Sequence, residues 1–217
     1  VRNLDRPRSI PEDLPGKKVL SSDPMDAVHD PEIDAIVELV GGEDHPRIWI
    51  KEALESGKNV ITANKAVLAI HGEELFNIAL EQKKGLYYEA SVAAAVPVLQ
   101  VIQQGIPAGP VDRLMGILNG TCNYILDSLE ENSFEHSVEL AQKAGLAEAD
   151  PTLDVSGMDS AHKLALLARI LLGYTVSVED MRVEGIVGID PIDLSFGWSH
   201  DLRLKLVGVL ARNGKGT

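Results

Sequence analysis

The residues best suited to chemistry are Lys163 and the four carboxylates that precede it, Glu148, Asp150, Asp154 and Asp159. Asp159 lies four positions before Lys163, so on a helix the two side chains share a face and can form an ion pair. An exposed pair of this kind contributes on the order of a few tenths of a kcal/mol and has no chemical role. The other carboxylates fall in a predicted loop before the helix, and this gathering of acidic groups near one lysine also fits an acid–base site.

The predicted helix Met158–Leu172 is apolar nearly all round, so its middle and end are expected to be buried. Burial lowers the proton affinity of a lysine and nearby carboxylates raise it, so together they can tune the lysine for proton transfer. Such a lysine can accept the hydroxyl proton of an alcohol while hydride leaves the same carbon. The remaining carboxylates can bind an ammonium group, so the pattern suits an amino-acid alcohol.

Lys65 is a second candidate, because it follows the predicted strand 59–63. If that strand belongs to a parallel sheet, Lys65 lies at the carboxyl edge, where ligands bind in open α/β folds. A lysine after a strand can equally be a solvated surface residue.

The segments that must position these residues alternate between strand-like and helix-like in the first part of the chain. The predicted strands are 34–40, 59–63 and 86–90, and the predicted helices are 46–56 and 71–84. This alternation favours a parallel sheet covered by helices, because parallel strands need long crossover connections.

The pattern changes after about Val92, where an apolar segment containing Pro97 predicts a helix up to Gln104. Further helices are predicted over 122–131, 134–144 and 158–172, and strands over 111–118, 181–187 and 204–211. We therefore predict two domains, 1–92 and 93–217.

Composition excludes several classes of partner. The 33 acidic and 20 basic residues give a formal net charge of −13, which repels nucleic acid and anionic membrane surfaces. The single cysteine, Cys122, excludes an intrachain disulfide and is typical of the cytoplasm. No segment approaches the roughly 20 consecutive apolar residues that span a bilayer, and the N-terminal residues do not resemble a signal peptide.

The segment from Ala144 to Lys163 resembles the signature segment of homoserine dehydrogenases. Four other stretches agree with that family in order: Val37 to Gly42, Gly57 to Ala66, Tyr88 to Val92 and Gly116 to Ile125. The resemblance runs from about Val1 to Arg212, so it covers nearly the whole chain.

The resemblance implies an α/β fold with an incomplete Rossmann-type dinucleotide-binding domain over 1–92, followed by an α+β substrate-binding and dimerisation domain over 93–217. The family begins with a strand and a Gly-x-Gly-x-x-Gly turn that holds the pyrophosphate, and this sequence contains no such turn. The absence of an initial methionine, and an end before the family's closing strands, lead us to expect a fragment.

The family's reaction is the NAD- or NADP-dependent interconversion of L-homoserine and L-aspartate 4-semialdehyde, in threonine, methionine and isoleucine biosynthesis. The resemblance therefore implies a cytoplasmic oxidoreductase that forms a homodimer through a sheet of its second domain. The alternative is a catalytically silent fragment that keeps the substrate and dimerisation fold. Another amino-acid or sugar dehydrogenase would require the resemblance over 148–163 to be coincidental.

Position by position, the resemblance assigns Lys163 to proton transfer at the substrate hydroxyl, with Asp159 orienting it and the substrate. Glu148 is the expected carboxylate for the homoserine amino group, and Asp154 is a nearby contributor. Lys65 is expected beside both nicotinamide and substrate, where its charge favours the polarised oxygen of the transition state.

The same resemblance assigns Gly41 and Gly42 to close approach of the backbone to the dinucleotide, and Gly145 to the cofactor edge of the substrate loop. Arg2 is suited to the ribose 2′-phosphate of NADP, although an exposed terminal arginine can equally be inert.

The resemblance also implies a monovalent cation such as sodium, bound by Glu89 and the carbonyls of Val92, Ala94 and Val96. The family has a glycine-rich run here, whereas this sequence has Ala93-Ala94-Ala95. Alanine at positive φ costs about 1 kcal/mol per residue, so we expect a local backbone shift or an altered cation site.

Overall fold

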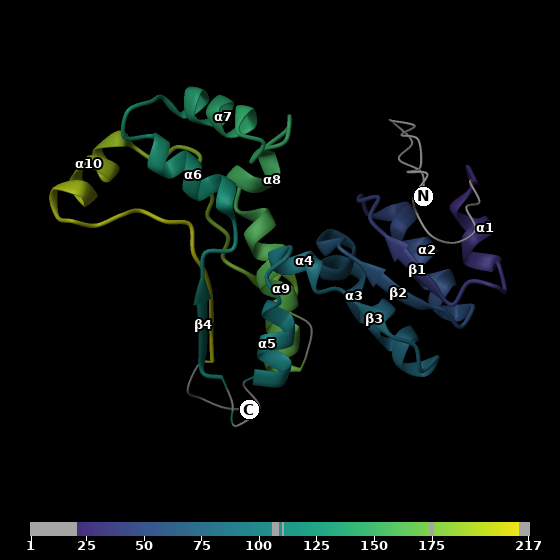
Figure 1. The fold of residues 1–217 in the computed structure, drawn as a ribbon. Coiled ribbons are helices and arrows are strands. Elements are labelled where there is room, and N and C mark those ends of the chain that lie inside the picture. The colour runs from purple at the N-terminus through teal and green to yellow at the C-terminus, as the bar shows by residue number, and fades with distance from the viewer. Residues whose placement is uncertain (1–20, 106–108, 110, 174–175, 213–217) are drawn as a thin grey trace. The chain divides into compact units, whose positions relative to one another are not determined.

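The protein is described by a computed structural model that covers residues 21–105, 109, 111–173 and 176–212. Its contacts divide the chain into two compact units, Val1–Ala94 and Ala95–Thr217, here called unit 1 and unit 2 (Figure 1). The domain boundary predicted from the sequence, between residues 92 and 93, lies two positions earlier.

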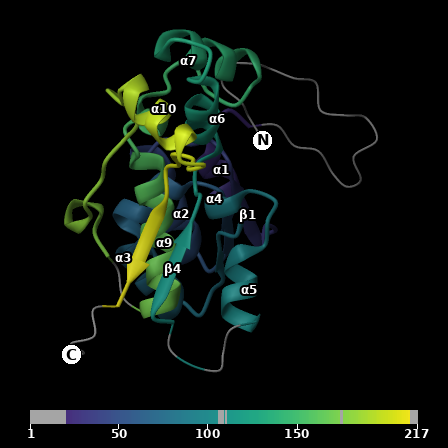
Figure 2. The same ribbon diagram turned by 90° about the vertical axis from the view of Figure 1, so that its left-hand side faces the viewer.

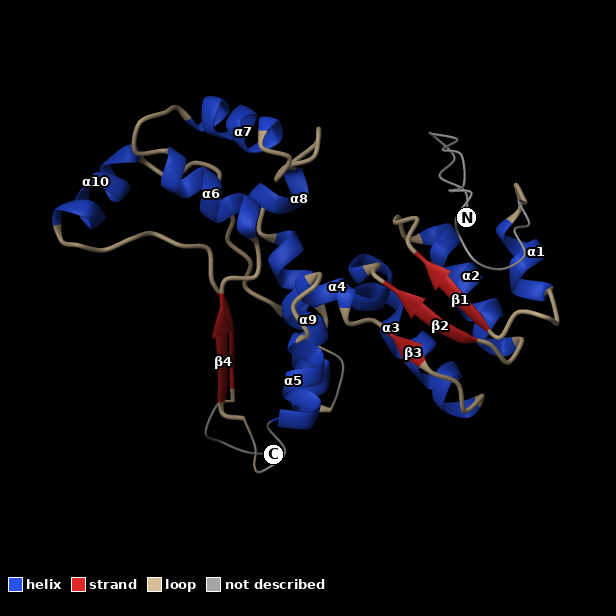
Figure 3. Cartoon of the chain, in the orientation of Figure 1, coloured by secondary structure: helices blue, strands red, loops and turns tan. Residues whose placement is uncertain are grey.

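Unit 1 contains a three-stranded parallel sheet in the order β1-β2-β3, so the predicted parallel sheet is confirmed (Figure 3). Its strands are β1 (Ala35–Glu38), β2 (Asn59–Thr62) and β3 (Leu86–Tyr87), and its helices are α1 (Pro24–His29), α2 (Asp44–Glu55), α3 (Lys65–Glu81) and α4 (Ala90–Ala93). The two helices predicted over 46–56 and 71–84 correspond to α2 and α3.

Several boundaries in unit 1 differ from the prediction, and two of the differences have a clear local cause. Helix α3 begins six residues earlier than predicted, because the Asn64 side chain caps it by accepting from the Val67 amide. Strand β3 ends at Tyr87, because the amide and hydroxyl of Ser91 both donate to the Tyr88 carbonyl and close a turn. The chain then enters α4, where the sequence predicts a strand up to residue 90.

Unit 2 contains a two-stranded antiparallel sheet, β4 (Arg113–Gly116) and β5 (Gly208–Ala211), seen side by side in Figure 2. Helix α9 packs against β5, α5 and α8 and forms the centre of the unit. The helices of unit 2 are α5 (Val98–Gly105), α6 (Gly120–Ser128), α7 (Phe134–Lys143), α8 (Thr152–Val155), α9 (Met158–Leu172) and α10 (Pro191–Ser199), with a 3-10 turn at Val178–Asp180. The long apolar helix predicted over 158–172 is confirmed to the residue.

The strand predicted over 181–187 is wrong. The Ile186 amide donates to the Val155 carbonyl at 2.8 Å, so this segment bonds to the end of α8 and not to a strand. Its apolar side chains pack all the same, since Ile186 is fully buried with Cys122 and Ile125 of α6. The strand predicted over 204–211 is shorter than expected, because only Gly208–Ala211 pairs with β4.

Ala94 has φ 49° and ψ −111°, a conformation that residues with a Cβ rarely adopt. Of the three alanines, only Ala94 therefore takes up a backbone conformation suited to glycine. We expect Ala94→Gly to raise the free energy of unfolding by about 1 kcal/mol in urea denaturation of the full-length protein. Ala93→Gly, within helix α4, is the matched control and should lower it. Equal destabilisation by both changes would contradict strain at Ala94.

In the described residues, no helix is both long and apolar enough to cross a membrane.

Candidate functional site

Lys163 is held between two oxygen acceptors in unit 2. Its Nζ lies 2.7 Å from Asp159 Oδ2 and donates to the Leu118 carbonyl at 2.8 Å. The exposed fraction is 18% for the Lys163 side chain and 7% for that of Asp159, so this is not a solvated surface pair. Removing two charges from water is costly, and such pairs are typical of sites where the charges have a task.

Asn119 joins two of the predicted carboxylates. Its Nδ2 donates to Asp154 Oδ1 at 2.7 Å and to Asp159 Oδ2 at 2.8 Å. The structure therefore brings Asp154, Asp159 and Lys163 together around Asn119, and these four residues are called the Lys163 cluster below. Three of the four are predicted from the sequence, and Asn119 is not.

Helix α6 fixes the position of Asn119. Asn119 is its N-cap, and Oδ1 accepts from the Cys122 amide at 2.7 Å. Asn123 of the same helix donates to the Asn119 carbonyl at 2.8 Å, so the residue is anchored through both its side chain and its backbone. Asn119 is only 3% exposed.

A tight turn between α8 and α9 sets the distance between Asp154 and Asp159. Gly157 forms this turn with φ 84°, where an L side chain is strained. Gly185 packs against the same turn so closely that a Cβ there would lie 2.2 Å from the Val155 carbonyl oxygen. The segment 181–187, which is not a strand, therefore packs against the turn that carries Asp154 and Asp159.

Cys122 lies beside the cluster but is unsuited to nucleophilic chemistry. Its Sγ lies 3.0 Å from the Asp154 carbonyl oxygen, to which the thiol donates. Burial raises the pKa of the Cys122 thiol to about 12, and the negative charges of Asp154 and Asp159 add to the rise. A thiol with this pKa stays protonated near neutral pH, so it acts as a weak donor and not as a nucleophile.

The formal charges of the cluster indicate what it can bind. Two carboxylates and one ammonium leave one net negative charge, which a substrate ammonium can balance. Lys163 is the group that can exchange a proton with a substrate hydroxyl, since its Nζ is held in place by two acceptors.

Glu148 is not joined to the Lys163 cluster by any hydrogen bond within the described part of the chain. It lies on an exposed loop after α7, where its carbonyl accepts from Gln142 Nε2 at 3.0 Å. Gly145 ends that helix with φ 72°, and nothing lies within 4 Å of the position a Cβ would occupy. The loop thus presents the Glu148 side chain and the Gly145 backbone to solvent.

In unit 1, Glu38 organises the carboxyl edge of the parallel sheet. Its Oε1 accepts from the amides of Val40 and Gly41 at 2.8 and 3.2 Å, and its Oε2 accepts from Thr62 Oγ1 at 2.6 Å. Glu38 is 4% exposed, so these bonds are shielded from water. The buried carboxylate links the loop after β1 to the end of β2.

Asn64 completes this edge. Its side-chain Nδ2 donates to the Gly42 carbonyl at 2.8 Å, and its backbone N–H donates to Thr62 Oγ1 at 2.9 Å. Gly41 and Gly42 have φ of 80° and 81°, and nothing lies within 4 Å where a Cβ would stand. The glycine backbone is therefore held in place by hydrogen bonds with two side chains and is left open at both Cα atoms.

Lys65 is the first residue of the 17-residue helix α3 and is partly buried. It thus lies at the carboxyl edge of the sheet and at a helix N-terminus, two features that favour anionic ligands. Arg2 lies outside the described residues.

The predicted cation ligands lie in and just after α4. Glu89 is the N-cap residue of that helix and Val92 is buried, whereas Val96 is 62% exposed. No group of three or more His, Cys, Asp or Glu side chains suited to a metal ion occurs among the described residues. The predicted cation ligands are of a different type from such a side-chain group, because three of the four are backbone carbonyls.

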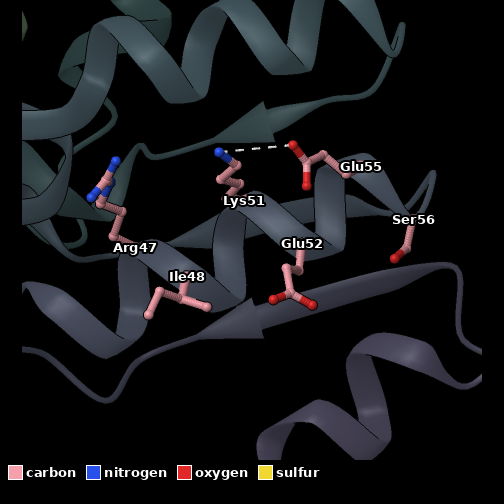
Figure 4. A pocket seen from close by; sticks show the side chains of 6 residues that line it. All are labelled: Arg47, Ile48, Lys51, Glu52, Glu55 and Ser56. Atoms are coloured by element: carbon pink, nitrogen blue, oxygen red, sulfur yellow. Dashed lines mark ion pairs between the residues drawn. The ribbon is translucent and has the colours of Figure 1, made fainter.

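A surface pocket of about 440 Å³ lies elsewhere, along the exposed face of α2 (Figure 4). Its lining mixes both signs of charge, and Lys51 pairs with Glu55 at 4.0 Å within it. None of the predicted site residues lines this pocket, so we assign it no part in the chemistry. The lining residues are Arg47, Ile48, Lys51, Glu52, Glu55 and Ser56.

Comparison with known families matches both units. A model described as "Homoserine dehydrogenase" matches residues 97–214, and one described as "Homoserine dehydrogenase, NAD binding domain" matches residues 1–89. Among curated relatives, homoserine dehydrogenase of Bacillus subtilis is 39% identical over 216 residues, covering 99% of this chain and 49% of the relative. That of Pseudomonas aeruginosa is 39% identical over 218 residues, covering 100% of this chain and 50% of the relative.

Solved structures agree. A crystal structure of a homoserine dehydrogenase from Thiobacillus denitrificans has a TM-score of 0.86 at 37% identity, covering 90% of this chain and 46% of that one. One from S. aureus has a TM-score of 0.73 at 34% identity, with coverages of 90% and 46%. The predicted fold class is confirmed, and the chain spans about half the length of the curated relatives it matches.

Proposed function

Because this chain belongs to the homoserine dehydrogenase family, we propose that the protein of which it is part interconverts L-homoserine and L-aspartate 4-semialdehyde with NAD or NADP. The observation that carries this proposal is the Lys163 cluster, in which a mostly buried lysine contacts Asp159 at 2.7 Å and a neighbouring carboxylate is bridged to it by Asn119. The cluster offers a proton acceptor and an ammonium-binding surface, the two functions that homoserine needs.

In the forward direction, Lys163 in its neutral amine form accepts the proton of the homoserine hydroxyl and becomes an ammonium, which Asp159 holds in place. A bound nicotinamide supplies the hydride acceptor. Asp154 adds negative charge on the ammonium side of the substrate, and Glu148 is the carboxylate proposed to bind that ammonium directly. In the reverse direction, Lys163 returns the proton to the aldehyde oxygen.

Removal of the Glu148 charge should weaken substrate binding more than catalysis. For Glu148→Gln in the full-length protein we expect the KM for homoserine to rise about tenfold, since a charge-assisted hydrogen bond is lost, with kcat little changed. Steady-state kinetics measure both. Glu139→Gln on α7 removes the same charge from an exposed site and is the control. An unchanged KM for Glu148→Gln would remove this residue from the substrate site.

The carboxyl edge of unit 1 is the proposed dinucleotide site. Gly41 and Gly42 leave room for close approach of the backbone, and Glu38 and Asn64 hold that backbone in place. Lys65 is proposed to stabilise the polarised oxygen of the substrate, and Gly145 to contribute the cofactor edge of the substrate loop. Arg2 is the proposed contact for a 2′-phosphate, and the choice between NAD and NADP depends on it.

We further propose a monovalent cation such as sodium at Glu89 and the carbonyls of Val92, Ala94 and Val96. Support comes from the family and from the positive φ of Ala94, which preserves a glycine-like turn in this segment.

We propose a homodimer formed through the exposed face of the β4–β5 sheet. Met115 is 64% and Val209 45% exposed; these two residues pair in register, and Ile117 beside them is 55% exposed. An apolar sheet face of this kind indicates a protein partner, and a second copy is the partner that the family implies.

The dimer proposal predicts that Met115→Lys shifts the full-length protein toward monomer, since two lysines would then be buried in a symmetric interface. Analytical ultracentrifugation measures the equilibrium. Leu80→Lys, on an exposed position of α3 in unit 1, should leave it unchanged. A Met115→Lys protein that remains dimeric would exclude this face.

A silent fragment is the second candidate for the isolated chain, because the chain spans about half the length of its relatives and contains no Gly-x-Gly-x-x-Gly turn. Side-by-side assays of this chain and the full-length protein distinguish the two. Hydride transfer only by the full-length protein would make the isolated chain silent, and transfer by both would exclude that alternative.

A further inference from the structure

We propose that Asn119 is a positioning residue for the reaction, because its amide sets the arrangement of the two carboxylates that serve Lys163 and the substrate ammonium. The inference rests on the proposed function and adds to it a residue that does not itself touch the reacting atoms. Asn119 acts through Asp154 and Asp159.

The geometry assigns each polar atom of the Asn119 side chain a separate task. Nδ2 carries two hydrogens and donates at 2.7 Å to Asp154 Oδ1 and at 2.8 Å to Asp159 Oδ2. Oδ1 accepts from the Cys122 amide at 2.7 Å. Because the residue is only 3% exposed, water has little access to replace these hydrogen bonds.

The amide is the chemical group that suits this place. Two carboxylates that approach one another repel, and a neutral group with two donors holds both without a second cation. Asp159 Oδ2 receives both this donor and the Lys163 ammonium at 2.7 Å. Any shift of Asp159 therefore moves the lysine, and a misplacement of about 1 Å can lower an enzyme's rate about 100-fold.

Helix capping alone does not account for these contacts. Asparagine, aspartate and serine cap helices about equally well, so a capping role predicts that Asn119→Asp and Asn119→Ser behave like the wild type. Neither replacement provides the two donors of Nδ2. Aspartate also adds a third carboxylate facing two others, so the proposal ranks the variants wild type, then serine, then aspartate.

The test compares these variants in the full-length protein by steady-state kinetics and thermal unfolding. For Asn119→Ser we expect kcat/KM for homoserine to fall about 100-fold, with the KM for the dinucleotide unchanged. For Asn119→Asp we expect a larger fall in kcat/KM. If that variant does not fold, the result for Asn119→Ser decides. Ser133→Ala, which removes the cap of α7 in the same unit, should lower the melting temperature and leave kcat/KM unchanged.

A crystal structure of Asn119→Ser makes the result independent of activity. We expect the Asp154 and Asp159 carboxylates to be displaced relative to the wild type. Unchanged carboxylates together with a wild-type kcat/KM would overturn the proposal. If the wild-type protein shows no homoserine oxidation, the proposed function fails, and the position of the carboxylates still decides whether Asn119 arranges them.

Discussion

Replacing Lys163 by alanine should lower kcat for homoserine oxidation about 10³-fold, because general-base catalysis by a positioned side chain contributes about 10²–10⁴. The structure gives the reason for expecting a large effect. The Nζ is fixed by Asp159 Oδ2 at 2.7 Å and by the Leu118 carbonyl at 2.8 Å, and water is largely excluded from the pair.

Lys143→Ala provides the matched control. Lys143 lies on α7 in the same unit, and its side chain is 70% exposed beside Glu139. Its removal should leave kcat and the KM for homoserine unchanged. Circular dichroism and thermal unfolding establish whether each variant is folded. A folded Lys163→Ala protein with an unaltered rate would exclude this lysine from proton transfer.

Gly185→Ala should cost about 3 kcal/mol of stability and disturb the Lys163 cluster, because the added methyl group has no space. Its Cβ would lie 2.2 Å from the Val155 carbonyl oxygen and 2.7 Å from backbone atoms of Ser156. These are backbone atoms at the α8–α9 junction, so relief requires the whole turn to move. Asp154 and Asp159 lie on the two sides of that turn.

Urea denaturation of the full-length protein measures the loss, and kcat/KM reports its effect on the cluster. Gly105→Ala is the control, since the Cβ there would meet only Val101 Cγ1 at an ordinary contact distance of 3.7 Å. Gly105 ends helix α5 in the same unit. Equal stability of the two variants would contradict the close packing of Gly185.

The elements of this fold were predictable where a local pattern is strong. The strands β1 and β2 follow from short β-branched runs, and α9 follows from a fifteen-residue segment whose apolar residues fall on nearly every face of a helix. The segment 181–187 has the same composition as a strand but docks on the end of α8. The apolar character of Ile186 predicts that its side chain is buried. It does not specify whether the Ile186 amide bonds to a neighbouring strand or to the end of a helix.

Helix α10 is not among the helices predicted from the sequence, although it has helix-start residues. Asp190 caps it by accepting from the Ile192 amide, and Pro191 occupies its first turn. These two residues together are a recognisable helix start. Its apolar residues give no inward-facing stripe, since Ile192 and Phe196 are exposed and only Leu194 is buried.

The candidate site was predictable only in part, for a related reason. Lys163 and Asp159 are neighbours on one helix, so their pairing follows from spacing. The Asn119–Asp154 bond joins residues 35 positions apart, and the Glu38–Thr62 bond joins residues 24 apart. Contacts over such separations depend on the packing of α6 on α8 and of β1 beside β2, and no local pattern specifies them.

The most direct test of the account is the rate of nicotinamide reduction by the full-length protein with L-homoserine, followed by the absorbance of the reduced cofactor with NAD and with NADP in turn. The account predicts reduction of at least one of them that depends on homoserine and is lost in Lys163→Ala. If a protein shown to be folded reduces neither NAD nor NADP at saturating homoserine, the account is contradicted.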